Sequence, residues 1–211
     1  IKKWNRKNKG ASSEYSMSKG HLIVLSAPSG TGKTTICKQL LNNNPKWKFS
    51  ISATTRKLRE GESDGKDYIS ISNEEFEHAV KFGDFLEWEW VHGNKYGTPI
   101  TPLEDALDTG DVMLLDIDVK GSMSVMDEFP DKTLGIFIEP PGDNIPEQLE
   151  ILEERLGQRG NEPPQLIAKR LKRFALEIEY KDKFKYHFIN EELDELNKWW
   201  RNQLASAAWN E

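Results

Sequence analysis

The chain alternates between short apolar runs and longer segments in which apolar residues recur at helical spacing. Three apolar runs, at 22–25, 112–118 and 134–138, are typical of strands that are buried on both faces of a sheet. Helical segments lie between these runs, and strands that alternate with helices favour parallel pairing. The pattern therefore predicts an α/β fold with a parallel sheet at the centre of a three-layer core.

The remaining elements follow from the same pattern and from the residues that break it. Further strands are expected at 48–52, 68–71, 85–92 and 186–189. Helices are expected at 33–41, 72–82, 99–107, 119–128, 147–156, 165–181 and 193–209. Two stretches, 50–98 and 142–164, interrupt the alternation, and we interpret them as insertions into the core, the first of them mostly antiparallel.

The period of an element also gives directions for its side chains. A capping box at 72–75 opens the second helix, whose inward-facing residues are expected to be Phe76, Val80 and Phe82. In the strand that follows, Glu87 and Glu89 fall on the same side. The tryptophans of the last helix are expected to pack on the sheet rather than to take part in chemistry; they are Trp199, Trp200 and Trp209.

A Gly-rich turn, Ala-Pro-Ser-Gly-Thr-Gly-Lys-Thr-Thr, joins the first strand to the first helix. Such a junction binds phosphate, because backbone N–H groups and the positive end of the helix dipole face the anion. Gly30 and Gly32 let the backbone approach an oxyanion closely. Lys33 is in position to reach the β- and γ-phosphates of a nucleoside triphosphate, and the Thr34 hydroxyl is in position to bind Mg²⁺.

Charged residues elsewhere suggest where a second phosphate and a metal ion would bind. Arg56 and Arg59 lie three residues apart in a polar loop, and two guanidinium groups suit the oxygens of one phosphate; the alternative is a solvated loop with incidental charges. Asp116 and Asp118 end a buried strand, where ligands bind in open α/β sheets. They could hold Mg²⁺ or contact a substrate, and the alternative for one of them is a cap of the next helix.

Composition narrows the function further. The 211 residues carry a net charge of −6, which argues against general nucleic-acid binding, because that binding relies on clustered cations. The single cysteine, Cys37, is expected to pack in the core, and it favours a reducing, cytoplasmic compartment. No apolar run approaches the ~18 residues of a membrane span. Residues 1–16 are polar and basic, and we interpret them as a leader or tag, with a transit peptide as the alternative.

Taken together, several blocks of the chain resemble guanylate kinase. They are Ser-Ala-Pro-Ser-Gly-Thr-Gly-Lys-Thr at 26–34, Ser-Ala-Thr-Thr-Arg-Lys-Leu-Arg-Glu-Gly-Glu at 52–62 with Gly65 and Asp67-Tyr68, Phe-Leu-Glu-Trp at 85–88, Tyr-Gly-Thr at 96–98 and Leu-Asp-Ile-Asp at 115–118. The resemblance runs from about residue 20 to the C-terminus. The block at 52–62 is the most specific, because it separates this family from other small nucleotide kinases.

The resemblance implies an activity and a division of the chain. The family transfers the γ-phosphoryl group of ATP to GMP with Mg²⁺, giving ADP and GDP. ATP and GMP are therefore the expected partners, without nucleic acid or membrane, for a protein that is a monomer or a homodimer. The domain at 17–211 would consist of a core at 17–49, 99–141 and 165–211, a small mixed α/β GMP-binding insert at 50–98 and a helical lid at 142–164.

The resemblance also implies roles for individual residues. ATP would be held by Ala27, Pro28, Ser29, Gly30, Thr31, Gly32, Lys33, Thr34 and Thr35, with Asn190 on the adenine side. GMP would be held by Ser52, Arg56, Arg59, Tyr68, Glu87, Tyr96, Thr98 and Asp118, with the Glu87 carboxylate on the N1–H and N2–H₂ donors of guanine. The transferring group would be met by Lys33, Arg56, Arg155, Arg159 and Arg170, and Mg²⁺ by Thr34 and Asp116.

Two departures from the family pattern and two alternatives remain. Ala27 stands where the first glycine of the turn is usual, and the stretch from Pro141 to Arg155 is several residues longer than usual. One alternative is the guanylate-kinase-like domain of scaffold proteins, which binds phosphorylated peptides without catalysis; the presence of Lys33 and Thr34 favours the enzyme. The other is a kinase for a different acceptor, including dGMP in preference to GMP; Glu87 with Thr98 favours guanine but leaves the sugar open.

Overall fold

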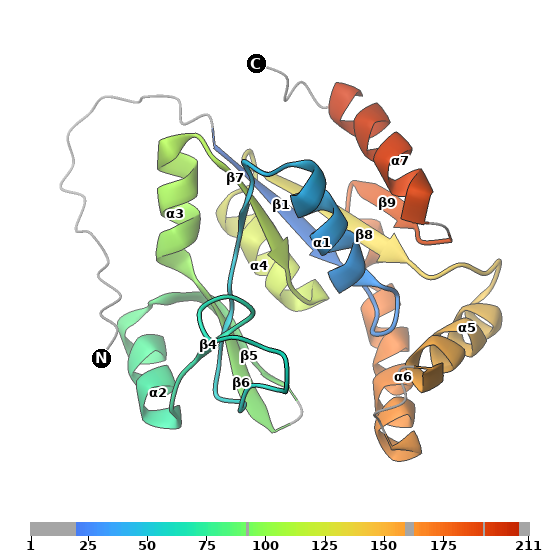
Figure 1. Ribbon diagram of the computed structural model, residues 1–211, viewed down its shortest axis with the longest axis horizontal. Helices are drawn as coiled ribbons and strands as arrows, with labels where there is room; N and C mark the ends of the chain where they lie inside the picture. The colour runs from blue at the N-terminus through green and yellow to red at the C-terminus, as the bar shows by residue number, and fades with distance from the viewer. Residues whose placement is uncertain (1–19, 92, 159–162, 192, 207–211) are drawn as a thin grey trace. The chain divides into compact units, whose positions relative to one another are not determined.

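The computed structural model describes residues 20–91, 93–158, 163–191 and 193–206 of the chain (Figure 1). These residues form two compact units. Of the described residues, unit 1 comprises 20–24 and 44–134, and unit 2 comprises 25–43 and those from Gly135 onward. The strands β1 (His21–Ser26) and β8 (Thr133–Glu139) each begin in unit 1 and end in unit 2.

Unit 1 contains part of a parallel sheet in the order β2-β7-β1, with β2 at Lys48–Phe49 and β7 at Val112–Asp116. The β2–β7 pairing is parallel, as the sequence predicts. The helices α3 (Ile100–Thr109) and α4 (Val119–Glu128) also belong to this unit, and α3 packs against β7. The buried core of the unit contains Leu22, Val24, Leu103, Ala106, Leu107, Met113, Leu115, Ile117 and Val125.

A second sheet in unit 1 has the strand order β4-β3-β6-β5. Its strands are β3 at Ala53–Thr54, β4 at Ile69–Ser70, β5 at Phe85–Val91 and β6 at Asn94–Pro99. The pairings of β6 with β3 and with β5 are antiparallel, whereas β3 and β4 pair in parallel. The prediction of a small, mostly antiparallel region within 50–98 is therefore confirmed.

Strands β3 and β6 were not predicted as strands, and three of the predicted strands are shorter than expected. The strand expected at 48–52 ends at Phe49, and β3 belongs to the other sheet. The strand expected at 68–71 keeps only Ile69 and Ser70. The strand expected at 112–118 ends at Asp116, because Asp118 turns to cap the following helix. Each shortening is at a strand end, where a hydrogen-bonding partner rather than side-chain character sets the limit.

Helix α2 (Asn73–Phe82) begins with the predicted capping box between Ser72 and Glu75 and ends at Gly83, whose φ of 68° is left-handed. Phe76 is fully buried, and the prediction for it is confirmed. The prediction that Phe82 faces inward is wrong, because its side chain is 58% exposed. Phe82 follows Phe76 by six residues, a spacing that places the two on different faces of a helix with 3.6 residues per turn.

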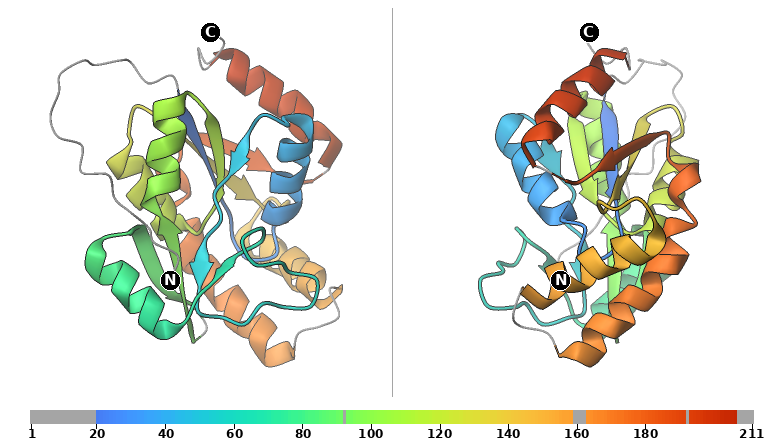
Figure 2. Two further views of the ribbon diagram at one scale, coloured as in Figure 1. Left: turned by 60° about the vertical axis from the view of Figure 1, so that its left-hand side comes forward. Right: turned by 90° about the vertical axis from the view of Figure 1, so that its right-hand side faces the viewer.

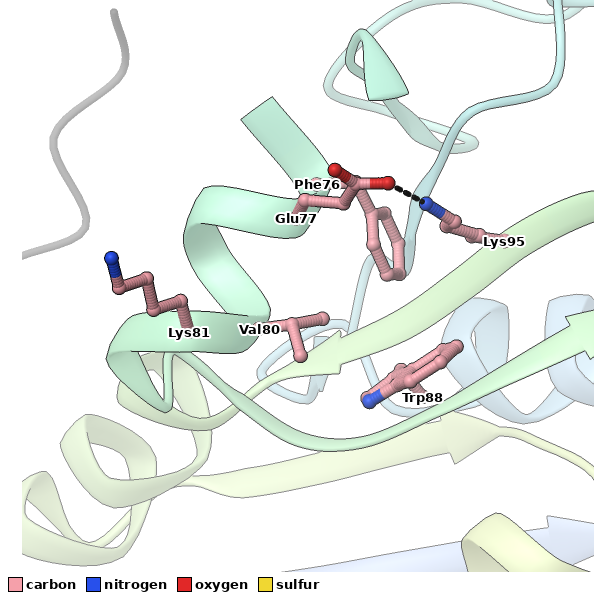
Figure 3. A pocket seen from close by; sticks show the side chains of 6 residues that line it. All are labelled: Phe76, Glu77, Val80, Lys81, Trp88 and Lys95. Carbon is pink, nitrogen blue, oxygen red and sulfur yellow. Dashed lines mark hydrogen bonds and ion pairs between the residues drawn. The ribbon is translucent and has the colours of Figure 1, made fainter. Parts of the chain in front are cut away.

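A small pocket of mixed character lies beside the face of β5 that carries Trp88 (Figure 3). Alternation along β5 places Trp88 and Trp90 on the face opposite to Glu87 and Glu89, and the tryptophans are 46% and 59% exposed. The pocket, of about 250 Å³, is lined by Phe76, Glu77, Val80, Lys81, Trp88 and Lys95. Two of these residues, Glu77 and Lys95, form an ion pair at 2.9 Å.

Unit 2 contains the parallel pair β8–β9, in which β9 is Tyr186–Ile189 and Ile136 lies opposite Tyr186. The helices α5 and α6 lie side by side (Figures 1 and 2). The helices of the unit are α1 at Lys33–Asn43, α5 at Ile145–Gln158, α6 at Pro164–Ile178, the short 3₁₀ helix η1 at Lys181–Lys183 and α7 at Leu193–Ser206.

The packing of unit 2 agrees with the side-chain predictions that fall on described residues. Trp200 is 6% exposed, and the Trp199 ring lies 5.4 Å from that of Phe188 in β9, whereas Trp209 lies outside the described residues. Cys37 is buried in α1, as expected. Residues 1–16 also lie outside the described ranges. None of the described helices has the length and apolar character that crossing a bilayer requires.

Candidate active site

The Gly-rich turn of unit 2 lies between β1 and α1, as the sequence predicts. Thr31 folds back on the turn, since its backbone N–H and its hydroxyl both donate to the Pro28 carbonyl, at 3.3 and 2.7 Å. The first helical bonds of α1 run from Thr35 and Ile36 to the Gly32 carbonyl, at 3.0 and 3.1 Å. The turn therefore leads directly into a helix N-terminus, which is the arrangement that binds phosphate.

Both glycines of the turn are required by the backbone and by close neighbours. Gly30 and Gly32 have φ values of 94° and 95°, which residues with a Cβ rarely adopt. A Cβ on Gly32 would lie 2.6 Å from the Asn190 side-chain nitrogen, and one on Gly30 would lie 3.1 Å from Leu156 Cγ in α5. Ala27 stands where the first glycine of the turn is usual. Its side chain is only 6% exposed, and a small side chain suits this buried position.

Three residues from other elements of unit 2 meet this turn. The Asn190 side-chain amide donates to the Thr31 carbonyl at 2.7 Å, and the Asn190 carbonyl accepts from Arg155 Nη2 at 3.1 Å. Arg170 of α6 reaches the Ser29 hydroxyl with a long bond of 3.5 Å. A pocket of about 350 Å³ opens here, lined by Gly30, Gly32, Thr35, Arg155, Gln158, Asn190 and Glu191. The structure thus brings Arg155 and Arg170 to the turn, while Arg159 lies outside the described residues.

The residues predicted for Mg²⁺ belong to different units, Thr34 to unit 2 and Asp116 to unit 1. Within the described ranges, no three or more His, Cys, Asp or Glu residues gather as a metal site would require. In kinases Mg²⁺ is held by one or two protein oxygens together with substrate phosphates and water, rather than by such a cluster. A hydroxyl on the first turn of α1 and a carboxylate at the end of β7 are oxygen donors of the required kind.

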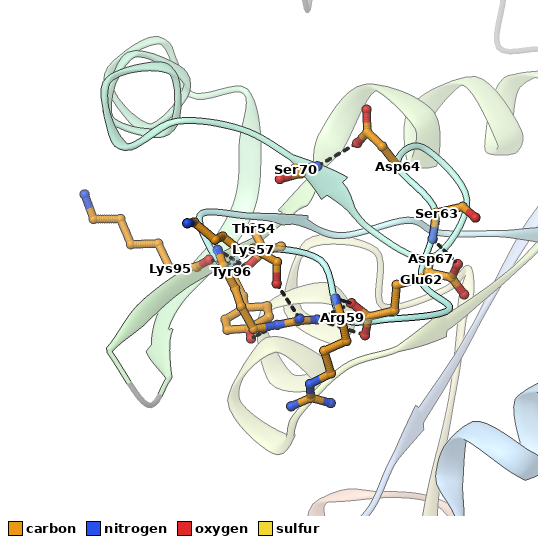
Figure 4. Close-up of polar contacts among 11 residues, drawn as sticks. Thr54, Lys57, Arg59, Glu62, Ser63, Asp64, Asp67, Ser70, Lys95 and Tyr96 are labelled. Carbon is orange, nitrogen blue, oxygen red and sulfur yellow. Dashed lines mark hydrogen bonds and ion pairs between the residues drawn. The ribbon is translucent and has the colours of Figure 1, made fainter.

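A second polar cluster, in unit 1, is centred on Arg56. Figure 4 labels three of its partners, Lys57, Glu62 and Tyr96. The Nη2 of Arg56 pairs with both carboxylate oxygens of Glu62, at 3.0 and 2.9 Å, and its Nε donates to the Tyr96 hydroxyl at 3.0 Å. Its Nη1 donates to the Lys57 carbonyl at 2.7 Å, and the guanidinium lies 5.1 Å from the centre of the Tyr68 ring. The arginine is therefore fixed in place by four hydrogen bonds and an aromatic face.

The electrostatics of this cluster follow from the ion pair. Burial favours the neutral form of both groups, but the bonds with Glu62 and Tyr96 raise the pKa of Arg56. The same burial is outweighed at Glu62, whose pKa is lowered by the backbone N–H of Arg59 at 2.8 Å and by Arg56. Figure 4 shows the Arg59 side chain pointing away from the Glu62 carboxylate. Arg59 thus supplies a backbone donor here, and its exposed guanidinium remains available to solvent or ligand.

The β5–β6 ladder places the remaining predicted residues on one face of the sheet. Glu87 lies directly opposite Thr98, and Glu89 lies directly opposite Tyr96. The Thr98 hydroxyl, which is 1% exposed, donates to Glu87 Oε1 at 2.5 Å. Side chains on one face of a strand recur every second residue, so these four residues point the same way. The sheet therefore presents two carboxylates, a hydroxyl and a phenol together.

Both carboxyl groups of this face have raised pKa values. Burial raises the pKa of Glu87 to about 7, the Thr98 hydroxyl opposes the shift, and the charge of Asp118 adds to it. The pKa of Glu89 is raised chiefly by a hydrogen bond with the Asp118 carboxyl and then by burial, while Lys120, at 3.2 Å, opposes the shift. A site with an ionisable acceptor poised near neutral pH is suited to reading hydrogen-bond donors.

Asp118 caps α4, since its carboxylate accepts from the Gly121 N–H at 2.9 Å. The expectation that one of the aspartates at 116 and 118 caps the next helix is therefore confirmed for Asp118. Burial and the charge of Asp116 raise the pKa of the half-buried Tyr68. Ser52 is half-buried, and its carbonyl accepts from the Ile69 N–H at 2.9 Å.

Three features of the site were missed by the sequence reasoning. Glu62 lies in the block at 52–62, yet its pairing with Arg56 was not expected, because Glu60 in the same block offers the same local signal. The bond from Asn190 to the turn was not expected, because nothing local links residues 159 positions apart. The contact of Gly121 with Glu87 carries no signal in the sequence at all.

Comparison with known proteins gives one family. A guanylate kinase family model matches residues 19–207. The guanylate kinase of Chlorobium luteolum is 43% identical over 176 residues, which cover 83% of this chain and 86% of that protein, and the guanylate kinase of Clostridium tetani is 44% identical over 177 residues, covering 84% and 81%. A crystal structure of guanylate kinase from Anaplasma phagocytophilum has a TM-score of 0.69 and 34% identity, covering 90% of this chain and 87% of that one. The chain belongs to the guanylate kinase family of nucleoside monophosphate kinases.

Proposed function

We propose that this guanylate kinase transfers the γ-phosphoryl group of Mg²⁺-ATP to GMP, with GMP held by residues of unit 1 and ATP by the Gly-rich turn of unit 2. The observation that carries the proposal is the cross-strand pair of Glu87 and Thr98, on the same sheet face as Tyr96. This pair supplies acceptors for a base, and Tyr96 links it to the arginine cluster suited to a phosphate.

Guanine is distinguished from adenine by its adjacent N1–H and N2–H₂ donors. The ionised Glu87 carboxylate is acceptor-only and can receive both, while the Thr98 hydroxyl holds it in orientation at 2.5 Å. A site built to pair with particular donors rejects bases that lack them, because its own acceptors are then left unpaired in a partly buried position. Ser52 and Asp118 would complete the contacts with the nucleoside.

The GMP phosphate would be held by the Arg56 guanidinium with the hydroxyls of Tyr68 and Tyr96. Glu62 supports this role, because its bidentate pair fixes the arginine before substrate arrives. The incoming phosphate would then take the remaining Nη1 donor or replace Glu62. Arg59, exposed next to this pair, would add a second guanidinium to the same anion.

ATP would be held through its phosphates by the backbone N–H groups of residues 27–35 and by the Lys33 ammonium. Transfer of a phosphoryl group needs positioning and charge neutralisation more than a strong base. Lys33, Arg155 and Arg170 are the cations that we assign to this task, together with Arg159. Thr34 and Asp116 would hold Mg²⁺, which supplies further neutralisation of the phosphate charge.

We propose that dGMP is also accepted, because the base and the phosphate, which carry the recognition, are common to both substrates. We further propose the cytoplasm as the working compartment, supported by the presence of a single, buried cysteine, Cys37. Asn190 is assigned to the ATP side on its contact with Thr31.

The experiment that tests the proposal is the kinetic comparison of Glu87→Ala with the unchanged protein, using ATP with and without Mg²⁺. Loss of two charge-assisted hydrogen bonds should raise the KM for GMP by about 10- to 100-fold. The KM for ATP should change by less than about twofold, since the residues that we assign to ATP belong to unit 2 and Glu87 belongs to unit 1. An unchanged KM for GMP would overturn the assignment of Glu87 to the base.

A further inference from the structure

Gly121 is the third residue of α4, and its backbone is helical. A glycine in a helix lowers stability relative to alanine, because it has more conformational freedom to lose and adds no packing. Gly121 does not occupy a left-handed position or a turn, so its backbone gives no reason for a glycine. The reason must lie in what surrounds the missing side chain.

The space beside Gly121 is occupied by the carboxyl group of Glu87. A Cβ built on Gly121 would lie 3.0 Å from Glu87 Cδ, 3.2 Å from Oε2 and 3.3 Å from Oε1. This contact is possible because α4, which contains Gly121, packs against β5, which contains Glu87. The Glu87 carboxyl group therefore packs face-on against Gly121, in the space that a side chain at this position would need.

The carboxyl group cannot yield to a Cβ without losing its orientation. Its Oε1 accepts from the Thr98 hydroxyl at 2.5 Å, and Thr98 is fixed in the β5–β6 ladder directly opposite Glu87. On the helix side, the Gly121 N–H is fixed by its bond of 2.9 Å to the Asp118 carboxylate. Neither the Glu87 carboxyl group nor the Gly121 backbone can therefore move away from an added Cβ without losing a hydrogen bond.

We propose that Gly121 is a positioning residue for base recognition, because its lack of a side chain lets the Glu87 carboxylate rest against α4 in the orientation that receives guanine. The proposal rests on the proposed role of Glu87 and adds a residue that touches neither substrate. Displacement by a few tenths of an ångström would misalign both acceptor oxygens at once, since they belong to one rigid plane. The three atoms nearest to a Cβ on Gly121 all belong to Glu87, so the effect of adding one is expected first at the base.

The test is a double-mutant cycle of Gly121→Ala and Glu87→Ala in the full chain, measured as KM and kcat for GMP and ATP. Gly121→Ala alone should raise the KM for GMP by about 10- to 100-fold and leave the KM for ATP within about twofold. In the Glu87→Ala background, where no carboxylate remains to be displaced, the same change should alter the KM for GMP by less than about twofold. That loss of effect is a readout that a general weakening of the fold would not give.

Ser124→Ala is the matched control in the same helix, because within the described ranges the Ser124 hydroxyl donates to the Lys120 carbonyl alone, at 3.3 Å. It should change neither KM. If Gly121→Ala proves unfolded by circular dichroism, removing the carboxylate must restore folding in the double variant, and failure to do so would overturn the proposal.

Three outcomes of the cycle are decisive. An unchanged KM for GMP in Gly121→Ala, with Glu87→Ala impaired, refutes the positioning role and spares the proposed function. An equal effect of Gly121→Ala in both backgrounds also refutes the positioning role, since the effect would not pass through Glu87. An unchanged KM for GMP in Glu87→Ala overturns the proposed function itself.

Discussion

The ionisation of Glu87 should set the pH dependence of GMP binding, and replacing this residue with glutamine should remove that dependence. Burial raises the pKa of Glu87 from its ordinary value of 4.5 to about 7 in the folded protein without substrate. Guanine offers donors to this group, and only the ionised carboxylate can accept both of them. The fraction of protein that is competent to bind GMP is therefore the fraction with Glu87 ionised.

The magnitude follows from that pKa. With a value of about 7, nine tenths of the Glu87 carboxyls are ionised near pH 8, about a tenth near pH 6 and about a hundredth near pH 5. Apparent affinity scales with the competent fraction, so the dissociation constant for GMP should rise about tenfold from pH 8 to pH 6 and about a hundredfold by pH 5. A glutamate with its ordinary pKa would give almost no change down to about pH 6.

The assay is isothermal titration calorimetry of GMP across that pH range, with Glu87→Gln as the matched control. The GMP phosphate has its own ionisation near pH 6, and that ionisation affects both proteins alike. The ratio of the two dissociation constants therefore isolates the carboxyl group. The advantage of glutamate over glutamine should be about 10- to 100-fold near pH 8 and should shrink toward pH 5 as the carboxyl becomes neutral.

A ratio that stays constant from pH 8 to pH 5 would refute this reasoning. It would mean either that the carboxyl is not near the base or that its pKa is not raised. Carbon NMR of the Glu87 carboxyl in the protein without substrate separates these two causes, because the chemical shift reports the ionisation directly.

Other substitutions test the stability cost of Glu87 and the ATP side of the site. Because the pKa of Glu87 is raised in the folded state, that state binds more protons than the unfolded state between about pH 4.5 and 7. The free energy of unfolding therefore falls as the pH rises across this range. Glu87→Gln should recover up to about 3 kcal/mol of this free energy near pH 8 and little near pH 4.5, as measured by thermal melts. Lys33→Ala should lower kcat by about 100- to 1,000-fold in steady-state kinetics, because a positioned cation is lost, and a retained kcat would show that this charge is not used. Asn190→Ala removes a bond to the Thr31 carbonyl worth about 1 kcal/mol, so it should raise the KM for ATP about fivefold without changing that for GMP; equal changes in both would contradict a local role.

The sequence predicted the elements that carry the site because their signals are local. The Gly-rich turn, the strand before it and the helix after it are adjacent in the chain, and their order alone indicates a phosphate site. The capping box at Ser72 is equally local. The alternation along 85–91 placed Glu87 and Glu89 on one face before any pairing was known, because a strand has a period of two.

The contacts that fix the site could not be predicted in the same way. Glu87 lies opposite Thr98 and not one residue away because of an irregularity in register between Phe85 and Glu87, which depends on both strands. The pairing of Glu62 with Arg56 rather than with another cation depends on the path of the loop, which the sequence does not give. Gly121 reaches Glu87 only because a helix packs on a strand that precedes it by more than 25 residues.

Phe82 is a case in which a local signal, the helical periodicity of α2, predicted burial wrongly. An aromatic residue in an amphipathic helix is usually taken to face the core, but Phe82 is the last residue of α2, and the left-handed Gly83 then redirects the chain. Its ring contacts that of His78, with centroids 4.3 Å apart, rather than the core. Helix ends are where periodicity gives the least information about burial.

The measurement that tests the central claim most directly is a coupled assay of ADP release with Mg²⁺-ATP, in which GMP, dGMP, AMP, CMP and UMP are offered in turn. The account predicts turnover with GMP and dGMP alone, because only guanine presents the donors that Glu87 and Thr98 are placed to receive. Comparable turnover with AMP would contradict base recognition by this pair. No turnover with any acceptor, in folded protein, would contradict the assignment of catalysis to this chain.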